Sequence, residues 1–251
     1  MRRLCRRVLS GGRCVICDRL PGVRHGLCMG CLGECMQYHL DRTVEKSWVV
    51  SGEDGLRYRA GLRGLNEWIF GDVDVFEPGQ YGPVEVKEVT VRVLFEYRGV
   101  IRWLISELKY REGFWVVPIL GGLMAEALMA SADDGACIVP MPMHWLRLWQ
   151  RGYNAAGMLA RYAAEESGMM FDDSVLARVR HRVPQSCLSR RHRLINVRGC
   201  FRARMGCDKP VIVIDDVLTT GASLCEAVGE LKKSNSKQVQ AWAFAQAVSG
   251  E

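Results

Sequence analysis

The sequence predicts a mixed α/β protein, in which a parallel sheet flanked by helices follows a small zinc-binding module at the N-terminus. Two observations lead to this fold class. Short, continuously apolar strands such as "CIVP" and "VIVI" alternate with helical segments, as in parallel sheets covered on both faces. Four cysteines near the N-terminus form two C-x2-C pairs. We therefore expect a zinc knuckle over 1–38, an irregular linker over 39–90 and an α/β domain over 91–251.

The cysteine pairs predict a metal site. Two C-x2-C pairs separated by ten residues supply four thiolates, which fill the tetrahedral shell that Zn²⁺ prefers in structural sites. The expected ligands are Cys14, Cys17, Cys28 and Cys31. Three other residues lie near enough in the sequence to replace one of them: Cys5, His25 and Cys35. A redox dithiol is the alternative, but it needs only one pair. The odd total of eleven cysteines argues against a secreted disulfide framework.

The next elements follow from apolar periodicity. Residues 41–82 show weak periodicity, which suggests the irregular linker, whereas 84–97 alternate apolar and polar side chains as a half-buried strand does. Helical spacing of apolar residues then predicts a helix ending near Lys109. After it we expect an apolar helix over 116–130, a strand over 136–142, a helix over 154–167, a strand over 175–179, a strand over 211–215, a helix over 221–233 and a strand over 239–248.

The stretch "VIVIDDVLTTGAS", residues 211–223, predicts the functional site. Its apolar half is a buried strand, so Asp215 and Asp216 emerge where the chain leaves the core. The helix that follows begins near Gly221, and its free backbone N–H groups and positive dipole end can hold a phosphate. Two carboxylates would repel that phosphate, so we expect them to bind sugar hydroxyls or a cation. A phosphorylated ribose suits both the acidic pair and the start of the helix.

These thirteen residues are similar to the phosphoribosyl pyrophosphate (PRPP) signature of type I phosphoribosyltransferases. The cysteine pairs and the motifs over 96–111, 139–154 and 185–201 extend the resemblance to the ComF family of competence-associated, phosphoribosyltransferase-like proteins. The resemblance implies a type I phosphoribosyltransferase-like fold and a PRPP or ribose 5-phosphate ligand bound with Mg²⁺. It also implies a link to DNA uptake. Whether a phosphoribosyl group is transferred, and to which acceptor, is left open.

The resemblance also implies roles for individual residues. Asp215 and Asp216 would hold the ribose hydroxyls and stabilise positive charge at the anomeric carbon. The phosphate cradle would be Thr219, Thr220, Gly221, Ala222 and Ser223. By position, the cations for a diphosphate would be Lys109, Arg147, Arg151 and Arg191, although each could equally form a surface salt bridge. A lone histidine such as His144 is more often a packed or capping residue than a general base.

The charge distribution suggests an anionic partner. The formal net charge is +6, and residues 178–204 contain nine arginines and no acid. Such a block is either a solvated surface or a binding site for phosphate or nucleic acid. The second hypothesis is therefore a non-catalytic protein that binds single-stranded DNA or the uptake machinery, with Trp145, Trp149 and Tyr153 as stacking residues. Core or hinge positions are the more ordinary expectation for these aromatic residues.

The expected location is the cytoplasm. The basic start of the chain is followed by glycines and cysteines, unlike a secretory signal peptide. No uninterrupted apolar run approaches the roughly 18 to 20 residues of a membrane span. We therefore expect no membrane insertion.

Overall fold

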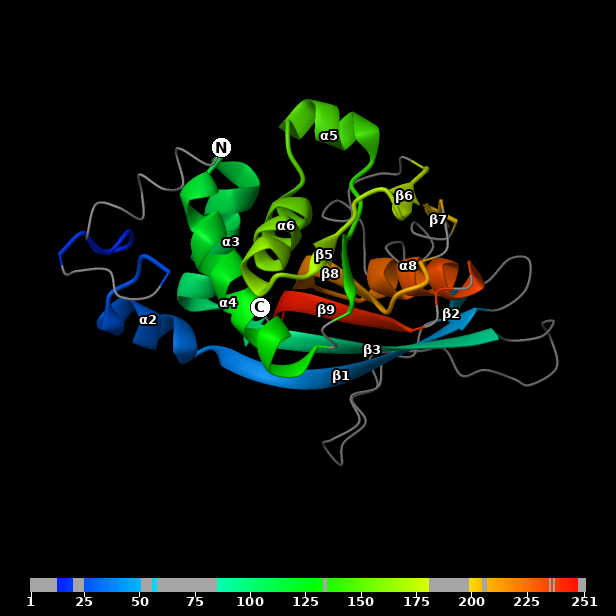
Figure 1. The fold of residues 1–251 in the computed structure, drawn as a ribbon, viewed down its shortest axis with the longest axis horizontal. Helices are drawn as coiled ribbons and strands as arrows, with labels where there is room; N and C mark the ends of the chain where they lie inside the picture. The colour runs from blue at the N-terminus through cyan, green and yellow to red at the C-terminus, as the bar shows by residue number, and fades with distance from the viewer. Residues whose placement is uncertain are drawn as a thin grey trace.

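The computed structural model describes residues 13–19, 25–50, 56–57, 85–132, 135–180, 199–204, 207–234, 236 and 238–247. Seven strands form one sheet in the order β2-β1-β3-β9-β8-β4-β5 (Figure 1). These strands are β1 (His39–Val50), β2 (Leu56–Arg57), β3 (Glu85–Glu96), β4 (Cys137–Pro140), β5 (Met170–Phe171), β8 (Val211–Leu218) and β9 (Val239–Gln246). All pairs from β3 to β5 are parallel, whereas β1 joins β3 and β2 in antiparallel register. The predicted mixed α/β class with a mostly parallel sheet is confirmed.

Helices cover both faces of this sheet. The helices are α2 (Met29–Met36), α3 (Gly99–Tyr110), α4 (Val117–Ser131), α5 (Trp145–Arg151), α6 (Ala155–Ser167) and α8 (Ala222–Lys233), with a 3₁₀ turn at Phe114–Val116. One core contains side chains of α3, α4 and α6 with Ile138, Ile212 and Phe244 of the strands. The other core joins Val139 and Val213 to α8 and to a separate antiparallel pair, β6 (Leu176–Arg178) with β7 (Phe201–Ala203).

The order of the strands defines where a ligand can enter. From β4 the chain passes through α6 to β5 at the sheet's edge, whereas from β8 it passes through α8 to β9 in the opposite direction. Because β4 and β8 are neighbours, the direction of winding reverses between them. Ligands of open parallel sheets bind beyond the carboxyl ends of the strands at such a reversal. A ligand is therefore expected beyond the end of β4, near the aspartates of β8.

Several expected elements differ from the structure. Residues 39–50 are not irregular but form β1, which pairs with β3 along most of its length. The strand expected near 175–179 is β6, and it pairs with β7 instead of joining the main sheet. α5 and β5 were not predicted, because α5 buries no side chain and β5 has two residues. Also not predicted were α2, β2 and β7, and β8 runs to Leu218, past its expected end at residue 215. The remaining strands and helices occupy the expected segments.

One stretch has the length and composition of a membrane span. Phe114–Ser131 has a mean hydropathy of 1.6, although Glu126 interrupts its apolar residues. Within the protein, 61% of this stretch is buried. Most of α4 is buried and belongs to the same core as α6, so it has the environment of a core helix.

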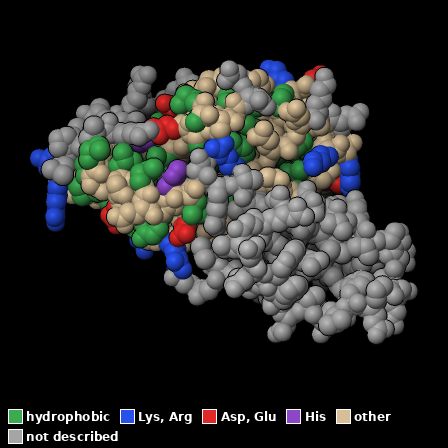
Figure 2. All heavy atoms as spheres, turned by 90° about the horizontal axis from the view of Figure 1, so that it is seen from below, with side chains coloured by type: hydrophobic (Ala, Val, Ile, Leu, Met, Phe, Trp, Pro, Cys, Tyr) green, Lys and Arg blue, Asp and Glu red, His purple; other side chains and the backbone are tan. Residues whose placement is uncertain are grey.

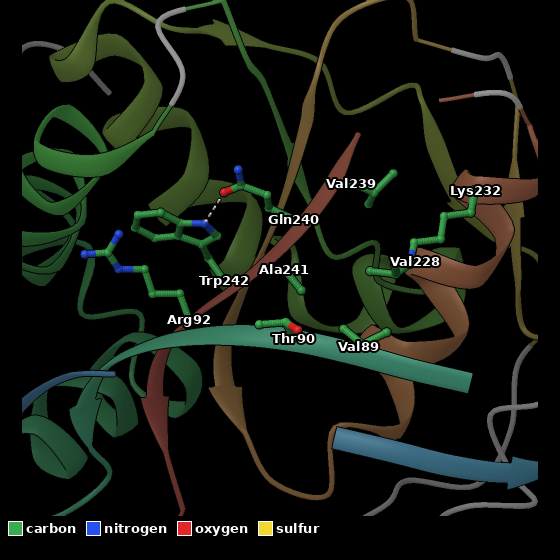
Figure 3. Close-up of a pocket in the computed structure, with 9 residues that line it drawn as sticks. All are labelled: Val89, Thr90, Arg92, Val228, Lys232, Val239, Gln240, Ala241 and Trp242. Atoms are coloured by element: carbon green, nitrogen blue, oxygen red, sulfur yellow. Dashed lines mark hydrogen bonds between the residues drawn. The ribbon is translucent and has the colours of Figure 1, made fainter. Parts of the chain in front are cut away.

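A hollow of about 300 Å³ lies at the other end of the sheet (Figure 3). Arg92 and Trp242 line one part of it, and Lys232 at the end of α8 lines another. Val239 and Gln240 also line it and begin β9, so this hollow lies at the amino ends of the parallel strands. It is therefore separate from the carboxyl ends of β4 and β8, where a ligand is expected.

Candidate ligand and metal sites

The four predicted cysteine ligands form one cluster. The sulfur atoms of Cys14, Cys17, Cys28 and Cys31 all lie within 4.8 Å of one another. The Cys17 and Cys28 sulfurs are 3.8 Å apart. A tetrahedral Zn²⁺ with bonds of about 2.3 Å separates its sulfur ligands by about 3.8 Å. The donor set and its spacing therefore fit a structural zinc ion, whose four thiolates would leave no position for water.

The electrostatics of the cluster also favour a cation. Burial opposes ionisation of the Cys14 thiol, but backbone N–H groups of Cys17, Cys28 and Ile16 outweigh it and lower the pKa to about 6. Burial and the neighbouring sulfurs raise the pKa of Cys31 far above its ordinary value. Four adjacent thiols cannot all ionise without a positive charge among them. A bound metal supplies that charge.

The alternative ligands in the described residues lie elsewhere. His25 Nε2 is 2.8 Å from Glu126 Oε1 of α4, so this ring joins the cysteine segment to the main core. Cys35 is fully buried in α2, and burial raises its pKa to about 11, which keeps it a thiol. Cys5 lies outside the described residues.

The two aspartates face opposite sides of the sheet. Side chains alternate along a strand, so Asp216 shares a side with Ile214, which packs in the α3, α4 and α6 core. On that side Lys109 Nζ lies 2.7 Å from Asp216 Oδ1. Asp215 points toward the other core, where its electrostatic neighbours include Arg178 of β6. We expected Lys109 to bind a diphosphate, but the structure pairs its ammonium with Asp216 of the acidic pair.

The protonation of Lys109 and Asp215 depends on burial and on the charges next to them. Burial opposes the charge on Lys109, but the adjacent Asp216 carboxylate outweighs burial and raises the pKa of the ammonium. Burial and the Asp216 carboxylate together raise the pKa of Asp215 to about 7, although Lys109 acts against them. Asp215 can therefore exchange a proton near neutral pH, while Lys109 stays charged.

The expected phosphate cradle has the required backbone. Gly221 precedes α8 with φ of +83°, a left-handed conformation that favours glycine. The buried Thr220 hydroxyl oxygen accepts a hydrogen bond from the Ala222 N–H at 3.4 Å. Thr219 is exposed beside it, and Ser223 lies in the first turn of α8. This turn places a helix N-terminus next to the acidic pair.

The predicted arginines are only partly brought together. Arg147 on α5 lies close enough to influence the charge of Arg178. Arg151, at the end of the same helix, lies over the Tyr110 ring with its Cζ 5.7 Å from the centroid. Arg191 lies outside the described residues. The sequence analysis did not single out Arg178, because no signal in the sequence separates it from the other arginines of its block.

The aromatic residues of α5 are not core residues. Trp145 and Trp149 are 65% and 81% exposed, which corrects the expectation of core tryptophans. Tyr153 is packed as expected: its hydroxyl donates to the Leu108 carbonyl, and its ring contacts Phe114 edge-on. His144 is buried and caps α5, accepting a hydrogen bond from the Leu146 N–H at 3.3 Å.

Comparison with known proteins identifies relatives. Over 153 residues the chain is 28% identical to competence protein F of Haemophilus influenzae, covering 57% of this chain and 67% of the relative. The chain is similar to competence protein F over this range. It is also 29% identical over 153 residues to the DNA utilization protein YhgH of Salmonella typhimurium. That match covers 59% of this chain and 67% of YhgH. No family model matches the chain.

Two solved structures that resemble the chain are of proteins named for phosphoribosyl compounds. A glutamine PRPP amidotransferase from B. subtilis, complexed with ADP and GMP, is 20% identical with a TM-score of 0.33. That match covers 49% of this chain, which spans 25% of the amidotransferase. A purine phosphoribosyltransferase from Pyrococcus horikoshii is 16% identical with a TM-score of 0.32, covering 53% of this chain and 84% of the other.

Metal removal tests the cysteine cluster. We expect about one zinc per chain, and chelation should lower the melting temperature by about 10 °C, since a ligand at about 1,000 times its Kd contributes about 4 kcal/mol. Cys14→Ser with Cys28→Ser should abolish the metal, whereas Cys35→Ala, which removes a buried cysteine outside the cluster, should retain it. Metal-free protein with full thermal stability would contradict a structural role.

The raised pKa of Asp215 predicts an unusual pH dependence. Between about pH 4 and pH 7 the folded protein holds a proton that the unfolded chain has released, so its unfolding free energy should fall as pH rises. The slope should be at most about 1.4 kcal/mol per pH unit. Urea unfolding should therefore show that Asp215→Asn gains stability relative to wild type as pH rises. The exposed Asp173 offers a control, because Asp173→Asn should parallel wild type. Parallel profiles for Asp215→Asn would refute the shifted pKa.

Proposed function

We propose that this protein binds PRPP or a related ribose 5-phosphate compound at the carboxyl ends of β4 and β8. The observation that carries the proposal is the turn from β8 into α8. The acidic pair lies in the last four residues of β8, and a left-handed Gly221 and a helix N-terminus follow it at the point where the sheet reverses its winding. The cellular role that we propose is in the use of incoming DNA, as the names of the relatives suggest.

The acidic pair and the first turn of α8 suit different parts of one ligand. The first turn of α8 and the Thr219 and Thr220 hydroxyls would donate hydrogen bonds to a 5-phosphate. Asp215 and Asp216 would accept hydrogen bonds from ribose hydroxyls. Lys109 would offset the charge of Asp216 until the ligand arrives, and it could then turn to a phosphate oxygen.

Mg²⁺ would enter with the ligand. Among the described residues, the metal-binding group of His, Cys, Asp and Glu side chains is the cysteine cluster, so the aspartates do not form a complete cage. Mg²⁺ often takes one or two carboxylates together with substrate phosphates. Asp215, partly buried and not paired with Lys109, is the carboxylate that fits this role. Zn²⁺ would occupy the cysteine cluster as a separate structural ion.

Thermal denaturation tests the proposed ligand. At about 100 times its Kd, PRPP with Mg²⁺ should add about 2.7 kcal/mol and raise the melting temperature by about 5 to 10 °C. Asp215→Asn, which keeps the side-chain volume, should remove most of this shift. Asp173→Asn is the matched control, because this exposed acid lies on the surface near Arg161 and should keep the full shift. No shift for the wild-type protein would refute the proposal.

A second candidate function is single-stranded DNA binding. The exposed Trp145 and Trp149 share one face of α5 and are available to stack on bases. Arg147 and Arg151 fall on the opposite face by helical spacing, so the stacking face itself has no cation from α5. On the face seen from below in Figure 2, the Lys and Arg side chains of the described residues are scattered among acidic and hydrophobic ones.

Titration of a fluorescent oligonucleotide at several salt concentrations tests this candidate. If stacking holds the strand, Trp149→Ala should weaken binding at least about fivefold with a small salt dependence. Trp103→Ala, which removes a half-exposed tryptophan of α3, is the control. Equal loss in both variants, or no binding by wild type, would exclude the stacking surface.

A further inference from the structure

The hollow at the amino ends of the strands opens where two strands separate. The pairing of β3 with β9 begins at Val91 and Ala241 and continues toward the carboxyl ends. Before that point β3 stays paired with β1 down to Glu85, whereas Val239 of β9 stays paired with β8. Figure 3 shows the two strands diverging there. The hollow of about 300 Å³ lies in the resulting notch, and its volume reaches the lower end of the range for ligand pockets.

The two faces of this notch differ in polarity. Side chains alternate along a strand, so Arg92 and Thr90 of β3 share one face. There Arg92 stands opposite Trp242 of β9, with its Cζ 4.7 Å from the centroid of the indole ring. The Trp242 Nε1–H donates a hydrogen bond to Gln240 Oε1 at 3.2 Å, which holds the amide in place. The other face is aliphatic and belongs to the core beneath α8: Val89, Val228, Val239 and Ala241.

The charged side chains that line the notch are both cations. Of its nine lining residues, Arg92 and Lys232 carry a charge and none is an acid. Lys232 is exposed in the last turn of α8, one turn after Val228, so both side chains lie on the side of the helix that faces the notch (Figure 3). Among the described residues, no carboxylate forms an ion pair with Lys232. The next residue, Lys233, pairs instead with Glu230.

This combination suits one class of ligand. An apolar body would bury the aliphatic face, and an anion would offset the positive charge. A phosphate monoester carries roughly −1.5 to −2 charges at neutral pH, so it matches two cations better than a carboxylate does. A neutral ligand would leave the cations without a counter-ion, and a free phosphate ion would leave the aliphatic face uncovered.

We propose that the notch between β3 and β9 is a second ligand site, which binds a small organic phosphate monoester with an apolar body. Lys232 binds the phosphate, the aliphatic face contacts the body, and Arg92 adds to the positive potential. The site is independent of the proposed function. Lys232 lies ten residues after Ala222, which is about 15 Å along the axis of α8 from the first turn that would hold a 5-phosphate. One small ligand therefore does not fill both sites.

An NMR titration of isotope-labelled protein tests the site. The indole N–H signal of Trp242, identified with Trp242→Phe, is the local reporter because this side chain lines the notch. The probes are phenyl phosphate, inorganic phosphate and benzyl alcohol. Phenyl phosphate should shift this signal saturably. The other two probes each lack one half of the ligand, so they should bind at least about tenfold more weakly. No saturable shift of this signal, or equal affinity for inorganic phosphate, would overturn the proposal.

Two adjacent lysines provide the matched variants. Lys232→Met keeps most of the length of the side chain and removes the charge, so it should weaken phenyl phosphate binding by about tenfold. Lys233→Met removes the same charge from a residue that pairs with Glu230, so it should change the affinity less than about twofold. Both lysines are exposed, so neither variant should lose the fold. Equal losses in the two variants would show attraction by net charge alone and would overturn the site, as would unchanged affinity in Lys232→Met.

Discussion

The central position of β8 constrains the rest of the molecule. Val211 to Ile214 are fully buried, because β8 is hydrogen-bonded to β4 on one edge and β9 on the other, with packed layers on both faces. Adjacent residues of such a strand must face different layers. Asp216 therefore forms its ion pair with Lys109 of α3, whereas Asp215 faces the layer that contains Arg178 of β6. One buried strand thus brings together charges from segments more than a hundred residues apart in the chain.

The cysteine segment shares a core with the sheet. Cys14, Leu27 and Cys35 are almost completely buried in the cluster that also contains α3 and α4. The His25 ring lies so close to Gly122 of α4 that an added Cβ there would approach its Nδ1 to 2.2 Å. Tyr38 packs equally tightly against Gly99, where α3 begins. A metal that orders the cysteines would therefore also fix the start of the helix whose last turn holds Lys109.

Local patterns in the sequence predicted most of the fold. The spacing of Cys14 to Cys31 is a short-range signal, and it was sufficient to predict the cysteine cluster. The apolar run before Asp215 is another, and it was sufficient to predict a buried strand there. β1 was missed because charged residues interrupt its alternation, so its existence depends on pairing with β3. The exposure of Trp149 could not be predicted, since an aromatic residue on a short helix resembles a core residue in sequence. The Lys109 ion pair and the position of Arg178 depend on contacts between distant elements, which composition and spacing do not encode.

The ion pair between Lys109 and Asp216 has a consequence for selectivity. For the ligand that we propose, a sugar hydroxyl that binds Asp216 Oδ1 would compete with an ammonium that already lies 2.7 Å away. Its binding would then be an exchange of counter-ions and not the filling of a vacant charge. A neutral sugar would lose this competition, whereas a ligand with phosphates would attract the released ammonium and could bring a divalent cation of its own. The resting pair would thus act as a threshold that favours densely charged ligands over simple polyols.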